Sequence, residues 1–216
     1  MSRTDFESRV VDRPTRLEDY GQIVEMQSTC FPGMTPWSRD QIHITPNERR
    51  WWGVQPGSDV LVFDTDRGKI AILICDDVEF PDLARIGCDM GAEILFVPFN
   101  TDERTGRLRV RKCAQARAIE NQCFVVISGV TGLLPQVENV DMHDAQCGVF
   151  TPSDFHFARD VIADEAVPNI ETLVIADVDL HTIRRKRVMG TAGPYADRRH
   201  DLYSIRYLSV IQEKPR

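Results

Sequence analysis

Residues 69–82, with the sequence KIAILICDDVEFPD, constrain the fold more than any other stretch of this 216-residue chain. The run from Ile70 to Ile74 is short and apolar, and it ends abruptly in acidic residues, which is typical of a buried strand in a parallel sheet. Pro81 suits the first position of a helix, and apolar residues then recur at helical spacing as far as Met90. The stretch therefore predicts a strand that leads directly into a helix over residues 81–90.

Cys75 lies where the predicted strand stops. A strand that turns into a helix at this point places the thiol at the carboxyl edge of a sheet, near amide N–H groups that favour a thiolate. This position suits a nucleophile. The alternative is that Cys75 packs in the core as a small hydrophobic residue, as many cysteines do.

The remaining pattern predicts an α/β fold in which strands alternate with right-handed crossover helices. Strands are predicted at residues 59–64, 69–74, 94–97, 124–128, 146–150 and 171–177. Helices are predicted at residues 16–27, 81–90, 108–121 and 181–189. In the helix over 108–121, Val110, Ala114 and Ala118 are expected to face the core.

Composition indicates in which compartment the protein is expected and which classes of partner it is not expected to bind. The formal charge of −7 argues against nucleic acid or an anionic membrane as the main partner. The chain shows no apolar span, no signal peptide and no Cys-x-x-Cys pair, so we expect a cytoplasmic protein with free thiols. We expect no cofactor and no metal. The group Asp141, His143 and Asp144 could bind a metal, but such a loop is more often solvated.

Several motifs resemble the carbon–nitrogen hydrolase (nitrilase) superfamily. The stretch ICDDVEFPDLAR, from Ile74, resembles its nucleophile motif, in which Cys is followed by an aromatic residue, Asp, two variable residues and Phe-Pro-Glu. The resemblance extends over about residues 42–208 through four further stretches, which are GAEILFVP, QARAIENQ, FTPSD and DRRHD. It implies a nitrilase-type α-β-β-α sandwich, a small-molecule amide or nitrile substrate, and a homodimer or higher oligomer.

The N-terminal part of the chain fits this resemblance poorly. Residues 13–34 resemble the start of a GNAT-type N-acetyltransferase domain, although no Gly-x-Gly loop for a pyrophosphate is present and acetyl transfer is not expected. We therefore expect an N-terminal arm and helix over residues 1–41 and a hydrolase domain over residues 42–216 that is incomplete at its N-terminal side. Strands 70–74 and 94–97 are expected to lack neighbours as a result, and exposed strand edges favour association with another chain.

The resemblance also assigns site residues. Cys75 matches the nucleophile, and Glu48 matches an accessory catalytic glutamate that positions the substrate. Asp76 stands where the family commonly has an aromatic residue, so it is expected to contact substrate and to raise the pKa of the thiol. Asn100 follows a strand end where the family lines its pocket. Without the resemblance, Glu48 would be an exposed loop carboxylate and Asn100 a loop cap.

Two family residues have no counterpart in the sequence. Gln41 occupies the position of the family's lysine, and residues 1–40 contain no strand that carries the general-base glutamate. Two functions therefore remain open. The chain is either an amidase-type hydrolase in which Glu48, Glu79 or a partner subunit supplies the base, or a catalytically inactive fragment that acts as a binding or assembly module.

Overall fold

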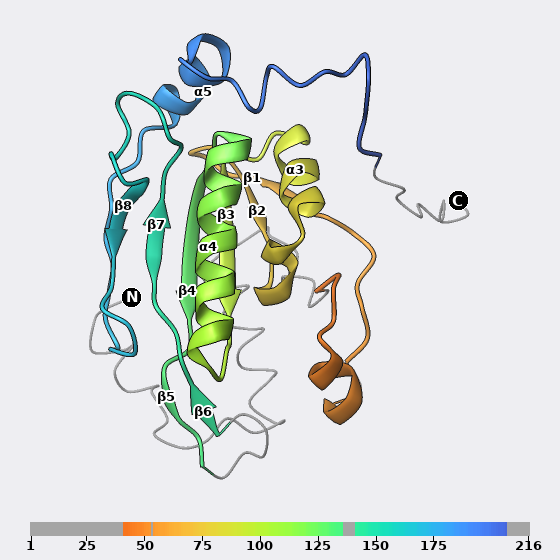
Figure 1. Cartoon of the computed structure of the whole chain (residues 1–216), viewed down its shortest axis with the longest axis vertical. Helices are drawn as coiled ribbons and strands as arrows, with labels where there is room; N and C mark the ends of the chain where they lie inside the picture. The colour runs from red at the N-terminus through yellow and green to blue at the C-terminus, as the bar shows by residue number, and fades with distance from the viewer. Residues whose placement is uncertain (1–40, 53, 136–140, 207–216) are drawn as a thin grey trace. The chain divides into compact units, whose positions relative to one another are not determined.

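The computed structural model describes residues 41–52, 54–135 and 141–206 (Figure 1). Its main sheet is built from the strands β1 (Val62–Asp64), β2 (Lys69–Ile72), β3 (Ile94–Phe99), β4 (Phe124–Gly129), β7 (Gly148–Phe150) and β8 (Ile162–Glu165). The helices are α3 (Pro81–Asp89), α4 (Arg104–Asn121) and α5 (Leu180–Met189). A 3₁₀ helix covers Cys75–Glu79, a π-helical turn covers Glu48–Trp52, and β5 (Gly132–Leu133) pairs with β6 (Met142–His143). The helix predicted at 16–27 lies outside the described residues.

The six strands have the order β1-β2-β3-β4-β7-β8. The central three, β2, β3 and β4, are parallel, and the outer strands are antiparallel to their neighbours. Helix α3 connects β2 to β3 and α4 connects β3 to β4, and the two helices pack side by side on one face of the sheet (Figure 1). The predicted α/β class is thus confirmed. Among the described residues this is one helical layer on one large sheet, which is half of the expected four-layer sandwich.

The core lies between this sheet and its two helices. Val110, Ala114 and Ala118 of α4 are fully buried, as their spacing predicts. They pack with inward-facing residues of the parallel strands, among them Leu95 and Val125. The two helices therefore cover the inward-facing side chains of the parallel strands.

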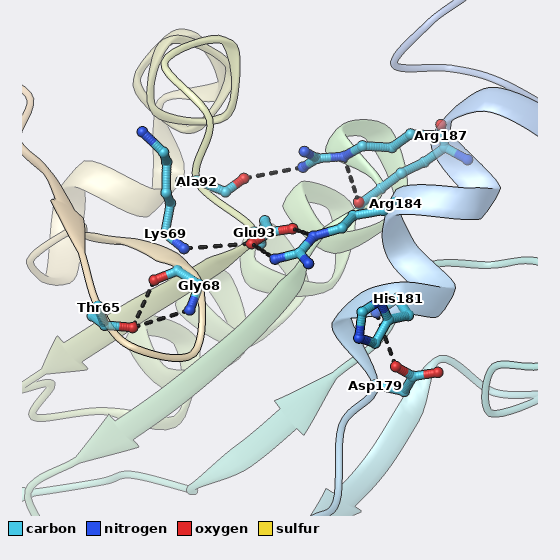
Figure 2. A network of polar contacts seen from close by, with 10 residues as sticks. Thr65, Gly68, Lys69, Ala92, Glu93, Asp179, His181, Arg184 and Arg187 are labelled. Carbon is cyan, nitrogen blue, oxygen red and sulfur yellow. Dashed lines mark hydrogen bonds and ion pairs between the residues drawn. The ribbon is translucent and has the colours of Figure 1, made fainter.

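Helix α5 packs against the amino ends of β3 and β4 (Figure 2). Arg187 donates hydrogen bonds to the backbone oxygens of Ala92, Asn121 and Gln122, which lie two or three residues before these strands begin. Arg184 forms a bidentate pair with Glu93, and this guanidinium lowers the pKa of the Glu93 carboxyl. The basic run of the helix therefore serves to anchor it to the sheet.

Two expectations about strands are wrong. Residues 171–177 form no strand, and β8, which the sequence did not predict, occupies the edge beside β7 instead. The predicted strands at 70–74 and 94–97 also do not lack neighbours, since β2 lies between β1 and β3, and β3 lies between β2 and β4. No helix of the described part is long and apolar enough to cross a membrane.

Candidate active site

Cys75 and Asn100 meet at the carboxyl edge of the sheet, as their positions after adjacent parallel strands predict. Cys75 begins the 3₁₀ helix that follows β2, and Asn100 comes directly after β3. The Sγ atom of Cys75 donates a hydrogen bond of 3.4 Å to the backbone oxygen of Asn100. The two residues therefore form one site, contributed by two neighbouring β-α units.

The backbone of Cys75 has a φ of 48°, in the left-handed region. An L-residue other than Gly in this region costs on the order of 1–3 kcal/mol, and such strain persists where the surrounding structure imposes it, often at functional sites. The tight turn between β2 and the 3₁₀ helix imposes it here. It places the thiol at the edge of the sheet, within hydrogen-bond distance of the backbone oxygen of Asn100.

The environment of Cys75 keeps it protonated. Burial raises the pKa of the thiol to about 11, and the negative charges of Glu48 and Asp76 add to this, while hydrogen bonding with the backbones of Asn100 and Asp76 opposes it. The effect expected of Asp76 is confirmed. The backbone hydrogen bond of Asp76, at the start of the 3₁₀ helix, lowers the pKa as expected, but desolvation outweighs it.

A cavity of about 690 Å³ opens above this edge of the sheet. It brings together all four residues that the resemblance assigns to the site, which are Glu48, Cys75, Asp76 and Asn100. Gln41, which occupies the lysine position, and Glu79 also line it. Residues far apart in the sequence therefore share one hollow of a size that suits a small molecule.

Glu48 is held firmly at the wall of this cavity. Its Oε2 atom accepts hydrogen bonds from the backbone N–H of Thr45 at 2.9 Å and from Oγ1 of Thr45 at 2.7 Å. Its Oε1 atom accepts none from any described residue, so this oxygen keeps its capacity to accept a proton. Glu48 is thus an oriented carboxylate, which the view of it as an exposed loop residue did not anticipate.

Glu79 is the second acidic candidate for a base, and it is already paired. Both of its carboxylate oxygens accept hydrogen bonds from Nε of Arg109, at 3.1 and 3.0 Å. Both oxygens of Glu79 are therefore engaged in this ion pair, whereas Oε1 of Glu48 accepts no hydrogen bond from a described residue. Of the two, Glu48 is better placed for proton transfer.

Gln41 is buried, with 5% of its surface exposed, and its Nε2 atom donates a 2.7 Å hydrogen bond to the backbone oxygen of His43. One amide hydrogen therefore remains for a ligand in the cavity. The side chain offers a hydrogen bond without a positive charge, which is less than a lysine offers to a developing oxyanion.

Asp77 and His43 hold the Gln41 segment in place, and the sequence did not single out either residue. The buried carboxylate of Asp77 accepts hydrogen bonds from the backbone N–H groups of Ile42 and His43, and it also contacts Nδ1 of His43. The His43 ring stacks on Phe80 with 3.5 Å between ring centroids. The signal for Asp77 was available, because it is the Asp of the nucleophile motif.

Within the group Asp141, His143 and Asp144, Asp141 is exposed, as expected of a solvated loop, whereas the other two contact residues elsewhere in the chain. Asp144 pairs with Arg107, and Nδ1 of the buried His143 contacts Oδ1 of Asn100 at 2.6 Å. The described part of the chain contains no group of three or more His, Cys, Asp or Glu residues placed to hold a metal ion. His143 instead contacts Asn100, which lines the cavity.

Comparisons with known proteins agree with this geometry. The carbon–nitrogen hydrolase family profile matches residues 16–188. A probable hydrolase of Bacillus subtilis, YhcX, is 60% identical over 191 residues, which cover 88% of this chain and 37% of the relative. Deaminated glutathione amidase of Dictyostelium discoideum is 40% identical over 79 residues, or 37% of this chain and 27% of that protein.

Solved structures give a consistent picture. Saccharomyces cerevisiae Nit3, a member of branch 10 of the nitrilase superfamily, superimposes with a TM-score of 0.52 at 28% identity, over 62% of this chain and 46% of Nit3. A carbon–nitrogen hydrolase from Helicobacter pylori matches in fold with a TM-score of 0.59 at 22% identity, over 76% of this chain and 58% of that one. The chain thus spans only part of the length of these relatives.

The family match begins at residue 16, inside the segment in which we expected an acetyltransferase-like start. The acetyltransferase resemblance finds no support in the family profile, in YhcX or in Nit3. Residues 1–40 lie outside the described residues, so the proposed boundary between residues 41 and 42 stays a prediction.

Proposed function

Since this chain belongs to the carbon–nitrogen hydrolase family, we propose that it hydrolyses small amides through a thioacyl intermediate on Cys75. The observation that carries the proposal is the thiol itself, held in a strained turn at the carboxyl edge of the sheet and open to a cavity that it shares with Glu48. A nucleophile and a carboxylate base in one cavity are the minimum for covalent amide hydrolysis.

The raised pKa of Cys75 determines when the thiol proton is transferred during the reaction. A thiol with a pKa of about 11 is almost fully protonated at neutral pH, so its proton must leave as Sγ attacks the carbonyl carbon. Oε1 of Glu48 is the proposed acceptor of that proton. The C–N bond of the tetrahedral intermediate then breaks as Glu48 returns the proton to the leaving amine, and water hydrolyses the thioester with Glu48 again as base.

Two donors face the developing oxyanion in this scheme. They are the amide of Gln41 and the backbone N–H of Asp76, the residue after the nucleophile. Because Gln41 lacks the charge of a lysine, we expect slow turnover, and loss of one oxyanion donor typically costs about 10²–10³ in rate. We therefore expect the glutamine at position 41, in place of a lysine, to lower kcat more than it weakens substrate binding.

The charge of the cavity suggests which amides enter it. Five carboxylate side chains line it, from Glu48, Asp76, Glu79, Asp102 and Glu103. Arg109 is the single Lys or Arg among its lining residues in the described chain, and it is paired with Glu79. We propose a neutral or cationic amide as substrate. An anionic amide would be repelled by these carboxylates.

A second function is favoured by two observations, the glutamine at position 41 and the raised pKa of Cys75. Both would be expected in a domain that binds an amide without cleaving it. On this alternative the cavity is a binding or assembly module. The two functions make different predictions for the fate of the bound amide.

Mass spectrometry of the intact protein, combined with an assay for released ammonia, separates the two functions. We expect propionamide to release ammonia slowly and to leave a thioacyl adduct on the wild type, with neither signal in Cys75→Ala. Cys113→Ala is the matched control, because it removes a half-buried thiol of α4 outside the cavity. Binding of the amide without ammonia or adduct would favour the binding module.

A further inference from the structure

The side chain of Asn100 lies between the cavity and a buried histidine. Its Oδ1 atom is 2.6 Å from Nδ1 of His143, a residue with only 7% of its surface exposed. An amide oxygen can only accept a hydrogen bond, so Nδ1 of His143 must carry the hydrogen. The other ring nitrogen, Nε2, is buried and has no hydrogen-bond partner among the described residues.

The segment that carries His143 is fixed to the segment that carries Asn100 by further hydrogen bonds. The backbone N–H of Asp144 donates to the backbone oxygen of Thr101 at 2.7 Å, and Oγ1 of Thr101 donates to the backbone oxygen of Asp144 at 2.6 Å. Together with the His143 contact, three hydrogen bonds therefore join residues 143–144 to residues 100–101. The imidazole cannot shift independently of the loop that lines the cavity.

This arrangement determines which part of Asn100 a ligand meets. Its side-chain oxygen is occupied by His143, and its backbone oxygen is occupied by the thiol of Cys75. The Nδ2 group is the polar part of the side chain that is left to the cavity, and it can only donate. A hydrogen-bond donor beside the nucleophile suits the carbonyl oxygen of an amide.

We propose that His143 is a positioning residue for amide hydrolysis, which holds Asn100 so that its Nδ2 donates to the substrate carbonyl beside Cys75. The proposal rests on the proposed function for its substrate. His143 itself touches neither the substrate nor Cys75. Its contribution is to prevent the Asn100 amide from turning its oxygen toward the substrate, where oxygen would repel oxygen.

The test uses a pair of thiol reagents, so that it does not depend on turnover. Chloroacetamide has a carbonyl oxygen for Asn100 to bind, whereas methyl methanethiosulfonate has none. The rate of Cys75 modification by chloroacetamide is divided by its rate with methyl methanethiosulfonate. This ratio measures the rate increase that depends on a hydrogen bond to the carbonyl oxygen, because general changes in thiol reactivity affect both rates. Wild type is compared with His143→Leu, which cannot donate, and with His143→Gln, which can.

We expect His143→Leu to lower this ratio about tenfold or more, since misplacing a positioning group commonly costs up to about 10²-fold. His143→Gln should retain most of it. His181→Leu is the matched control, because His181 is exposed at the start of α5 and should leave the ratio unchanged. An unchanged ratio in His143→Leu would overturn the proposal.

A measurement on the wild type covers the case in which the variants do not fold. Nitrogen-15 NMR of the imidazole should show the proton of His143 on Nδ1, and a proton on Nε2 alone would exclude the hydrogen bond to Asn100. Failure of the wild type to release ammonia from propionamide would count against the proposed function only. The rate ratio would still decide the role of His143.

Discussion

The carboxylate of Asp77 accepts a 2.8 Å hydrogen bond from the backbone N–H of His43. This contact joins the segment that carries Gln41 and Glu48 to the segment that carries Cys75. Asp77 belongs to the 3₁₀ helix that begins at Cys75. His43 follows Gln41 in the segment that leads to Glu48. The buried carboxylate of Asp77 therefore helps to set the positions of the base candidate and the oxyanion donor relative to the thiol.

We expect Asp77→Asn to weaken both stability and activity. The asparagine oxygen can accept one of the two backbone hydrogen bonds, while its NH2 group faces the other donor. Loss of a hydrogen bond to a buried charged group costs about 1–3 kcal/mol. Urea unfolding measures the free energy of unfolding, and Asp66→Asn, at a side chain that is 83% exposed, should leave it unchanged.

Glu48→Gln should affect the reactivity and the activity of Cys75 in opposite directions. Removing the negative charge of Glu48 lowers the pKa of the thiol from about 11, so alkylation by iodoacetamide at pH 8 should become faster. Hydrolysis should become slower, because the proposed base is lost. The pH dependence of alkylation, followed by mass spectrometry, checks the first effect and ammonia release checks the second.

The control for Glu48→Gln is Glu79→Gln, whose carboxylate is paired with Arg109. It should change hydrolysis much less than Glu48→Gln does. If Glu79→Gln instead abolished hydrolysis and Glu48→Gln did not, Glu79 would be the base and the assignment above would be reversed.

Asp154 should make the fold sensitive to acid. Burial alone would raise the pKa of this carboxyl, but hydrogen bonds from Thr191, Phe155 and Lys186 outweigh it and bring the pKa down to about 2. A carboxyl whose pKa is lower in the folded state stabilises the fold above pH 4 and loses this effect as the pH falls from about 4 toward 2.

The corresponding experiment compares thermal unfolding of wild type and Asp154→Asn between pH 7 and pH 3. The wild type should be the more stable protein at pH 7, and the difference should shrink steadily below pH 4. A difference that stayed constant over this range would show that the hydrogen bonds of Asp154 do not depend on its charge.

Arg187→Met should loosen α5 from the sheet. The substitution keeps much of the apolar stem but removes hydrogen bonds to the carbonyls of Ala92, Asn121 and Gln122, with an expected loss of about 1.5–3 kcal/mol. Arg185→Met is the matched control, because Arg185 is an exposed residue of the same helix. Equal losses of unfolding free energy in the two variants would contradict the anchoring role of Arg187.

Self-association is expected from the face of the sheet that α3 and α4 do not cover. Phe96 projects from β3 away from the buried Leu95 and Val97 and is 36% exposed. We expect light scattering coupled to size exclusion to give a mass above the 24.6 kDa of one chain, and Phe96→Lys to lower it. A wild-type peak at the mass of one chain at all concentrations would refute this expectation.

The sequence predicted those parts of the fold that depend on neighbours in the chain. The turn from β2 through Cys75 to α3 follows from a short apolar run and a proline, and the buried face of α4 follows from its spacing. The strand predicted at residues 171–177 is wrong because apolar alternation alone does not make a strand. A strand also needs a neighbouring strand to pair with, and these residues pair with none of the described strands. β8 was missed because Ala163 and Asp164 give it no apolar alternation.

In the candidate site, too, the sequence predicted the residues that lie in local motifs and missed those whose role depends on distant contacts. Cys75, Asp76, Asn100 and Glu48 were found through motifs that a reader can match along the chain. His143 was not assigned to it because its role depends on a contact with Asn100, 43 residues away, across separate loops. The pKa of Cys75 was also beyond sequence reasoning, since it depends chiefly on how deeply the thiol is buried.

The anchoring of α5 has a consequence for synthesis of the chain. The backbone oxygen of Ala92 accepts a hydrogen bond from Arg187, which lies 95 residues further along the chain. The backbone oxygen of Gln122 accepts one from the same side chain. A nascent chain that has completed β4 therefore still exposes these acceptors at the amino ends of its central strands. We expect the sheet to reach its final stability only after Arg187 has left the ribosome and α5 has bound to it.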